Sequence, residues 1–154
     1  MTSADQQAGK KPVLIEGAAS IDDRGSLTFI NGFPLPDYKR FYTVANHQQG
    51  FIRAWHGHLL ESKTLFILQG SVLACAVKMT DKVSPDKDQE ITRVVLDSRK
   101  PSALYVPKGY ANGFMSLSQN ALLLILSSTT LEESQGDDYR FPFDYWNPWQ
   151  VVPR

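Results

Sequence analysis

The stretch TLFILQGSVLACAVKM, residues 64–79, indicates the fold class of this chain. Two apolar runs, 64–68 and 71–79, flank Gln69-Gly70, a pair that is typical of a short connection between two strands. The runs themselves contain β-branched, aromatic and small apolar residues, as core strands do. The stretch therefore predicts a β-hairpin in the core of the protein.

The same pattern recurs along the chain. Short apolar segments are broken by turn signals, and we predict further strands at 12–16, 26–30, 39–44, 50–55, 91–96, 103–106, 113–117 and 121–127. Only 131–137 resembles a helix. Many short strands at regular spacing are typical of a sandwich, jelly roll or barrel. We therefore predict a single all-β domain over 12–154 after a flexible leader at 1–11, with the aromatic tail, 139–149, capping a barrel mouth.

The composition argues against several classes of protein. The chain has 154 residues, a formal net charge of zero and 42% hydrophobic residues, which fits one globular domain with a sizeable core. A general nucleic-acid binder would carry a basic excess. The first residues lack the apolar stretch of a signal peptide, and no apolar run is long enough to span a bilayer. We therefore expect a cytoplasmic protein that binds neither nucleic acid nor membrane.

Reactive side chains gather just before the predicted hairpin, in GFIRAWHGHLLESK, residues 50–63. Burying such groups beside a core without partners is unfavourable. The cluster therefore predicts a pocket that handles an anionic or proton-labile ligand, and an enzyme is the leading interpretation. Its members are Arg53, His56, His58 and Lys63.

Two segments resemble the motifs of the cupins. The first motif is represented by Gly50, His56, His58, Glu61 and Gly70, and the second by the segment PKGYAN, 107–112, in which Asn112 takes the place of a histidine. A transition-metal site needs about four ligands, and only the two histidines are clearly supplied. We therefore predict no metal, and a metal-dependent cupin such as a dioxygenase remains an alternative.

Within the cupins, the chain resembles the dTDP-4-dehydrorhamnose 3,5-epimerase family, the RmlC-like enzymes, and their relatives, the nucleotide-sugar 3,4-ketoisomerases. The ordered segments that carry this resemblance are DRGSL at 23–27, RAWH at 53–56, Lys63, QGSV at 69–72 and YVPKGYANGF at 105–114. The resemblance implies a jelly-roll barrel that forms a homodimer. It also implies an isomerase that acts on a 4-keto sugar joined to a nucleoside diphosphate, without metal or other cofactor.

The resemblance implies roles that suit the residue types. A ketone acidifies the neighbouring C–H bonds, and His56 is the expected base because imidazole exchanges protons near neutral pH. Lys63 would stabilise the enolate oxygen. Arg53 and Arg24 would hold the diphosphate with their guanidinium forks; by the resemblance, Arg24 does so in the pocket of a neighbouring subunit.

Further candidate site residues follow from the same comparison. Asp137, Asp138 and Asp144 lie where the family has the acid that orients the catalytic histidine, and we favour Asp138. Asn112 is expected to contact the substrate, and the ring of Tyr110 could stack on the nucleobase.

Two differences from the family's motifs leave the type of reaction undecided. Thr130 stands near the position of the epimerases' proton-returning tyrosine, and Asn112 cannot shuttle protons at neutral pH. His56 and His58 would share one face of a strand, and such a pair is typical of the ketoisomerases, which makes His58 a second catalytic candidate. We favour an epimerase because PKGYANGF resembles that branch. A 3,4-ketoisomerase and a non-catalytic nucleotide-sugar-binding module remain alternatives.

Overall fold

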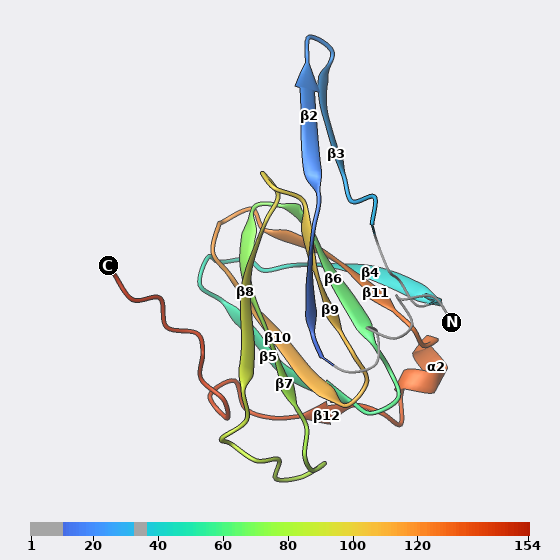
Figure 1. The fold of residues 1–154 in the computed structure, drawn as a ribbon. Helices are drawn as coiled ribbons and strands as arrows, with labels where there is room; N and C mark the ends of the chain where they lie inside the picture. Colours follow the sequence, from blue (N-terminus) through green and yellow to red (C-terminus); the bar gives the residue numbers. More distant parts are fainter. Residues whose placement is uncertain (1–10, 33–36) are drawn as a thin grey trace.

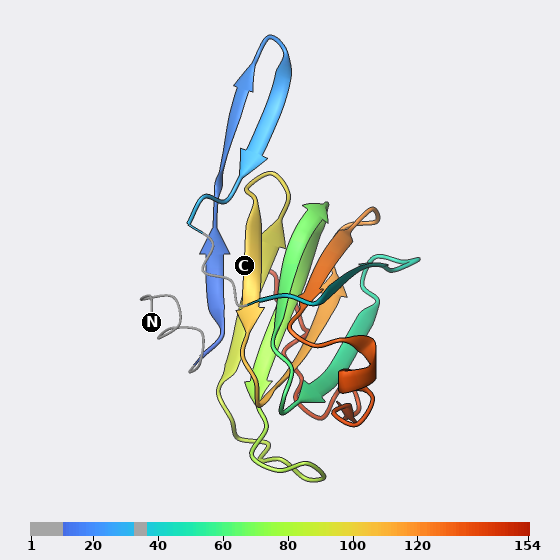
Figure 2. The same ribbon diagram turned by 90° about the vertical axis from the view of Figure 1, so that its right-hand side faces the viewer.

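The structure is a computed structural model that describes residues 11–32 and 37–154. Apart from Lys11, the predicted leader lies outside the described residues. The described chain is almost entirely β-structure, and two antiparallel sheets lie against each other as a jelly-roll barrel (Figures 1 and 2). The predicted fold class is therefore confirmed.

Each of the two main sheets has five strands. The first is built, in spatial order, from β1 (Val13–Glu16), β9 (Ser102–Val106), β6 (Lys63–Gln69), β11 (Leu122–Ser127) and β4 (Arg40–Ala45). The second is built from β12 (Tyr139–Arg140), β5 (Ile52–His58), β10 (Tyr110–Ser116), β7 (Ser71–Lys78) and β8 (Ile91–Asp97). β6 lies in the first sheet and β7 in the second, and the two strands do not pair with each other, so the prediction of a hairpin at 64–79 was wrong. Gly70, at a φ of 70°, lies where the chain passes from one sheet to the other.

Alternation along β7 creates two separate cores. Val72, Ala74 and Ala76 pack into the cluster between the sheets. Leu73 and Cys75 point the other way, into a second cluster on the outer face. A strand buried on both faces carries a nearly continuous apolar run, which explains the apolar sequence of β7.

The aromatic tail covers that outer face. Phe141, Trp146 and Trp149 pack there around the fully buried Trp55, whose indole N–H lies 3.0 Å from the carbonyl oxygen of Trp146. The prediction that the tail caps a barrel mouth was therefore wrong, because the outer face of the second sheet offers more apolar surface to bury.

A hairpin of β2 (Ala18–Asp22) and β3 (Gly25–Phe29) projects from one end of the barrel (Figures 1 and 2). β3 was predicted and β2 was not, because no residue of β2 is buried and its sequence has no core pattern. Two large apolar side chains at this hairpin are solvent-exposed, Ile21 at 79% and Leu27 at 64%. Ile21 pairs with Ser26 and Leu27 with Ser20, so these two apolar side chains lie on opposite faces of the hairpin.

Two boundaries matter for the site. β5 continues to His58 rather than ending at Trp55, so both histidines lie on the strand. The predicted helix is confirmed in a shorter form as α2 (Leu131–Ser134), where Thr130 accepts a hydrogen bond from the backbone N–H of Glu133 as the N-cap. Among the described residues, no helix is long and apolar enough to cross a bilayer.

Candidate active site

A cavity of about 450 Å³ lies between the two sheets, a size typical of small-ligand sites. The first sheet contributes Arg40, Tyr42, Val44, Lys63 and Ile125 to its lining. The second sheet contributes Arg53, His56, His58, Asn112, Phe114 and Arg140. Loops and α2 supply Glu61, Leu131, Ser134, Gln135 and Asp138.

A register shift explains how β5 sends several polar groups into this cavity. His56 pairs with Asn112 of β10, whereas Arg53, an odd number of residues away, pairs with Phe114. The irregularity between Asn112 and Phe114 therefore lets Arg53 and His56 both face the cavity. His58 follows at period two and also lines the cavity, as the sequence predicted.

His56 is half-buried and is held in its neutral form. Burial lowers its pKa to about 4, with further lowering by the positive charges of Arg140 and Lys63, against the opposing effect of Asp138. At neutral pH its imidazole therefore carries a free nitrogen lone pair. A neutral imidazole in a cavity with nearby cations can accept a proton from a ligand.

The first sheet brings an amine and a phenol to the same cavity. Lys63 is 8% exposed, and its Nζ lies 5.8 Å from the centre of the Tyr42 ring. The guanidinium of Arg40 lies 5.3 Å from that ring on the same strand. Sequence reasoning missed Tyr42 and Arg40, although period-two alternation in the predicted strand 39–44 would have placed both on one face.

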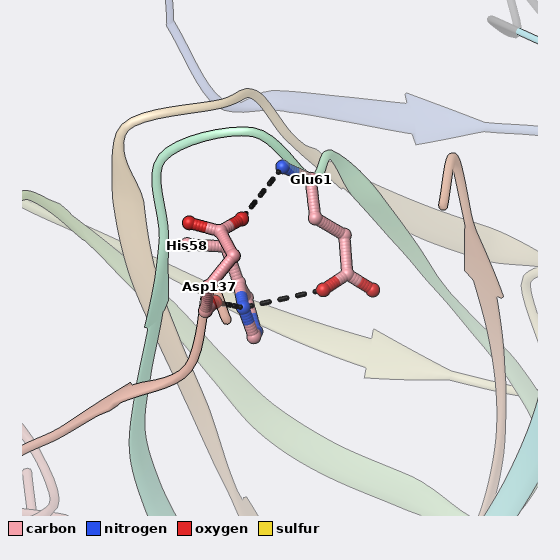
Figure 3. Close-up of side chains that lie close together, drawn as sticks. All are labelled: His58, Glu61 and Asp137. Atoms are coloured by element: carbon pink, nitrogen blue, oxygen red, sulfur yellow. Dashed lines mark hydrogen bonds and ion pairs between the residues drawn. The ribbon is translucent and has the colours of Figure 1, made fainter. Parts of the chain in front are cut away.

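His58, Glu61 and Asp137 form a buried group of three close side chains (Figure 3), and the first two also line the cavity. Nδ1 of His58 lies 2.6 Å from the carbonyl oxygen of Asp137 and 3.2 Å from Oε2 of Glu61. Burial, followed by the positive charge of Lys63, lowers the pKa of His58 below its usual value. Within the described part of the chain, His58 Nε2 and Glu61 Oε2 are buried without a hydrogen-bond partner.

These three side chains bring possible metal ligands within 4.8 Å of one another, but their donor set does not fit a cation. The Asp137 carboxylate already accepts backbone N–H bonds from Leu59, Leu60 and Glu61. Glu61 lies 3.1 Å from the Arg40 guanidinium and 4.0 Å from Lys63 Nζ. A metal ion would have to displace these contacts and stand beside two positive charges.

The three candidate acids differ in their position relative to the cavity. Asp137 anchors the loop after β5, and only Asp138 of the three lines the cavity. Asp138 is exposed at the rim, 3.0 Å from Nε of Arg140, and it acts on His56 through its charge. Asp144 is exposed and is not among the lining residues.

The predicted binding residues also differ in whether they line the cavity. Arg53 lies at the rim with its Nε 2.7 Å from the side-chain oxygen of Asn46. Asn112 lines the cavity and donates to the carbonyl of His56 over 3.2 Å. Tyr110 packs against the main core and is not among the lining residues.

Arg24 and Thr130 lie away from the cavity. Arg24 stands on the projecting hairpin, where it forms an ion pair of 2.6 Å with Asp22. Thr130 is occupied as the cap of α2. Neither of these two residues is part of the cavity lining within this chain.

The sequence over residues 32–141 matches the family model described as dTDP-4-dehydrorhamnose 3,5-epimerase, which covers well over half of the chain. No curated protein matches the chain.

Solved structures of similar fold come from two groups of enzymes. The sugar 3,4-ketoisomerase QdtA of Thermoanaerobacterium thermosaccharolyticum, in complex with TDP, is 26% identical over 88% of this chain and 91% of its own, with a TM-score of 0.65. The dTDP-4-dehydrorhamnose 3,5-epimerase of Bacillus anthracis, with TDP and PPi bound, is 20% identical over 99% and 90%, with a TM-score of 0.75. The epimerase of Sulfolobus tokodaii is 21% identical over 90% and 81%, with a TM-score of 0.73.

Proposed function

Because the chain belongs to the dTDP-4-dehydrorhamnose 3,5-epimerase family, we propose that it epimerises a 4-keto sugar carried on a nucleoside diphosphate. The reaction would break a C–H bond beside the ketone, at C3 or C5, and return the proton to the other face. The observation that carries this proposal is the pairing of His56 and Tyr42, which line one cavity from opposite sheets. We further propose that residues 12–154 act as one domain.

His56 is the proposed base. Its depressed pKa of about 4 keeps the imidazole unprotonated at neutral pH, so its lone pair is available for a proton from carbon. As the proton moves, the electron pair of the C–H bond becomes the enolate and negative charge appears on the ketone oxygen. Asp138 and Arg140, at the rim beside His56, adjust the charge around the ring.

Lys63 is proposed to receive that negative charge. The amine is largely withdrawn from water, and a positive charge acts more strongly on a developing oxyanion there than in bulk water. A single oxyanion donor of this kind typically contributes about 10²- to 10³-fold in rate.

Tyr42 is proposed to return the proton. Epimerisation needs an acid on the face of the sugar opposite the base, and Tyr42 belongs to the sheet opposite β5. Arg40 and Lys63 lie within 6 Å of its ring centre, so the proposed proton donor stands beside two cations that line the same cavity. Tyr42 would thus take the role that Thr130 cannot fill.

Charge supports a nucleoside diphosphate as the carrier of the sugar. Among the described residues, the cavity is lined by four cations and two carboxylates, the latter being those of Glu61 and Asp138. The cations are Arg40, Arg53, Lys63 and Arg140. An excess of cations suits a doubly negative diphosphate bridge. The bound TDP in QdtA and in the Bacillus anthracis enzyme supports thymidine as the nucleoside.

A homodimer is proposed from the projecting hairpin. Ile21 and Leu27 expose apolar side chains there, and burying one such side chain against a partner is worth roughly 1.5 to 3 kcal/mol. The hairpin would then carry Arg24 toward the cavity of the second subunit. We also propose a cytoplasmic location.

A 3,4-ketoisomerase is the second candidate, favoured by His58. Two imidazoles in one cavity could move protons between adjacent carbons on one face of the sugar, without an acid opposite. The likeness to QdtA supports this alternative.

Product analysis separates the candidates. The protein is incubated with TDP-4-keto-6-deoxyglucose, and the product is reduced with borohydride and identified by NMR. Sugars inverted at C3 or C5 support the epimerase, and a 3-keto product supports the ketoisomerase. An unchanged sugar under saturating conditions would refute both.

A further inference from the structure

Arg53 differs from the other cations of the cavity in the kind of partner it has. Each of the other three lies 3.0 to 4.0 Å from a carboxylate oxygen of Glu61 or Asp138. Within the described part of the chain, Arg53 forms no ion pair, and its Nε donates instead to the side-chain oxygen of Asn46 over 2.7 Å. An uncharged partner leaves the positive charge of the guanidinium uncompensated, and that charge is then available to an anionic ligand.

The amide group of Asn46 is held in one orientation by its partners. Its Nδ2 lies 2.8 Å from the hydroxyl oxygen of Ser116 and 3.2 Å from the carbonyl oxygen of Phe51. A carbonyl can only accept a hydrogen bond, and the Nε of Arg53 can only donate one. The NH₂ group of Asn46 therefore faces Phe51, and the amide oxygen faces Arg53.

These contacts connect three strands beside the cavity. Asn46 directly follows β4 of the first sheet, whereas Arg53 lies on β5 and Ser116 ends β10, both in the second sheet. Ser116 is buried, and its backbone N–H also bonds to the carbonyl oxygen of Phe51, over 3.2 Å. Arg53 itself is exposed, and a long exposed side chain loses conformational freedom when it binds a ligand. An anchored amide at Nε reduces that loss, because it already restricts the side chain.

We propose that Asn46 is a positioning residue, which holds Nε of Arg53 so that Nη1 and Nη2 bind one phosphate group of the nucleoside diphosphate through two parallel hydrogen bonds. The identity of the anion rests on the proposed function. Among the described residues, nothing hydrogen-bonds to Nη1 or Nη2, and such a two-point contact is the common geometry between a guanidinium and a phosphate. Arg53 lines the cavity and Asn46 does not, so Asn46 acts through Arg53.

The test is the affinity of the full chain for TDP, measured by titration calorimetry. Asn46→Ala removes the oxygen that holds Nε, and we expect the Kd for TDP to rise about 10-fold. Arg53→Met removes the guanidinium, and we expect a rise of about 10²-fold. Because Asn46 acts through Arg53, the double variant should bind TDP no more weakly than Arg53→Met alone. Two independent effects would instead multiply to about 10³-fold.

The matched control is Gln119→Ala. Gln119 donates to the carbonyl oxygen of His47 over 3.2 Å, so it supports the same connection between β4 and β5 without touching Arg53 or lining the cavity. This control should leave the Kd for TDP near that of the wild type. A second variant, Asn46→Asp, keeps an oxygen for Nε but compensates the charge of Arg53, and its Kd should also rise about 10-fold. With a sugar nucleotide, Asn46→Ala should raise KM and leave kcat nearly unchanged.

Three results would overturn the proposal. The first is an unchanged affinity for TDP in folded Asn46→Ala or Asn46→Asp. The second is a double variant in which the two losses multiply, because Asn46 would then act independently of Arg53. The third is an equal loss in Gln119→Ala, which would assign the effect to a loosened connection. A wild type that binds TDP but converts no sugar nucleotide would refute the proposed function alone, and one that binds no TDP would overturn both.

Discussion

Replacing Tyr42 by phenylalanine removes one oxygen atom from the cavity and leaves the ring. The contacts of that ring with Arg40 and Lys63, at 5.3 and 5.8 Å from its centre, are retained. We therefore expect the free energy of unfolding to change by less than about 1 kcal/mol. The proton donor itself is lost, and a positioned general acid typically contributes about 10²- to 10⁴-fold.

The Tyr42→Phe variant should separate removal of the proton from inversion of the carbon, which occur together in the wild type. His56 can still remove the proton, so a substrate in deuterated water should still acquire deuterium beside the ketone. Inversion should slow by at least about 10²-fold because nothing on the opposite sheet returns a proton. NMR of the sugar ring measures both rates in one sample.

Tyr38→Phe is the matched control. Its hydroxyl bonds to that of Thr64 rather than lining the cavity, so the same chemical change should leave both rates near those of the wild type. Inversion at a wild-type rate in Tyr42→Phe would refute the assignment of Tyr42. Equal loss of exchange and inversion would also contradict it, because it would place Tyr42 in binding instead.

Three other outcomes follow from the site and the hairpin. Lys63→Met should lower kcat by about 10²-fold or more with a smaller change in KM, and equal losses in binding and turnover would point to ground-state binding. Since the pKa of His56 is lowered to about 4, kcat/KM should persist down to about pH 4 and fall only below it. The free energy of unfolding should also decrease as the pH falls from the usual histidine range toward 4, because the imidazole of residue 56 takes up a proton at a higher pH in the unfolded chain than in the folded one. Acid titration followed by kinetics and by denaturant unfolding checks both, and an activity limb near pH 6.5 would contradict the environment described for His56. Ile21→Asp should shift the protein toward monomer in sedimentation velocity, and an unchanged dimer would exclude the hairpin from the interface.

The sequence predicts the strands well where they contribute to a core. β6 and β7 are apolar on one or both faces, and their pattern is visible in the chain itself. β2 was missed because it buries no residue and pairs only with β3. The alternation of apolar and polar residues in a sequence indicates which strand faces are buried. A hairpin that projects from the barrel has no buried face, so its sequence lacks that alternation.

The site was predicted in part, for a related reason. His56, His58 and Lys63 are close in sequence, and the consecutive strands β5 and β6, which lie in opposite sheets, bring them into one cavity as expected. Tyr42 and Arg40 come from β4, which reaches the cavity only through its pairing with β11. Pairing between strands so far apart in the sequence cannot be predicted from the residues of one strand alone.

Neighbouring residues of one type were the hardest to separate. Asp137 and Asp138 are adjacent, and one turns inward to hold three backbone N–H groups while the other faces the cavity rim. Only the course of the chain after α2 decides between them. Glu61 was visible to sequence analysis as a cupin acid, yet its contacts with Arg40 and Ser127 depend on two distant strands.

The central claim is that the imidazole of His56 removes a proton from the carbon beside the ketone. Its most direct test is the rate of deuterium uptake from deuterated water into a TDP-linked 4-keto-6-deoxy sugar, compared between the wild type and His56→Asn. The account predicts uptake at C3 or C5 with the wild type and a loss of at least about 10³-fold in the folded variant. Uptake at a wild-type rate in His56→Asn would contradict it.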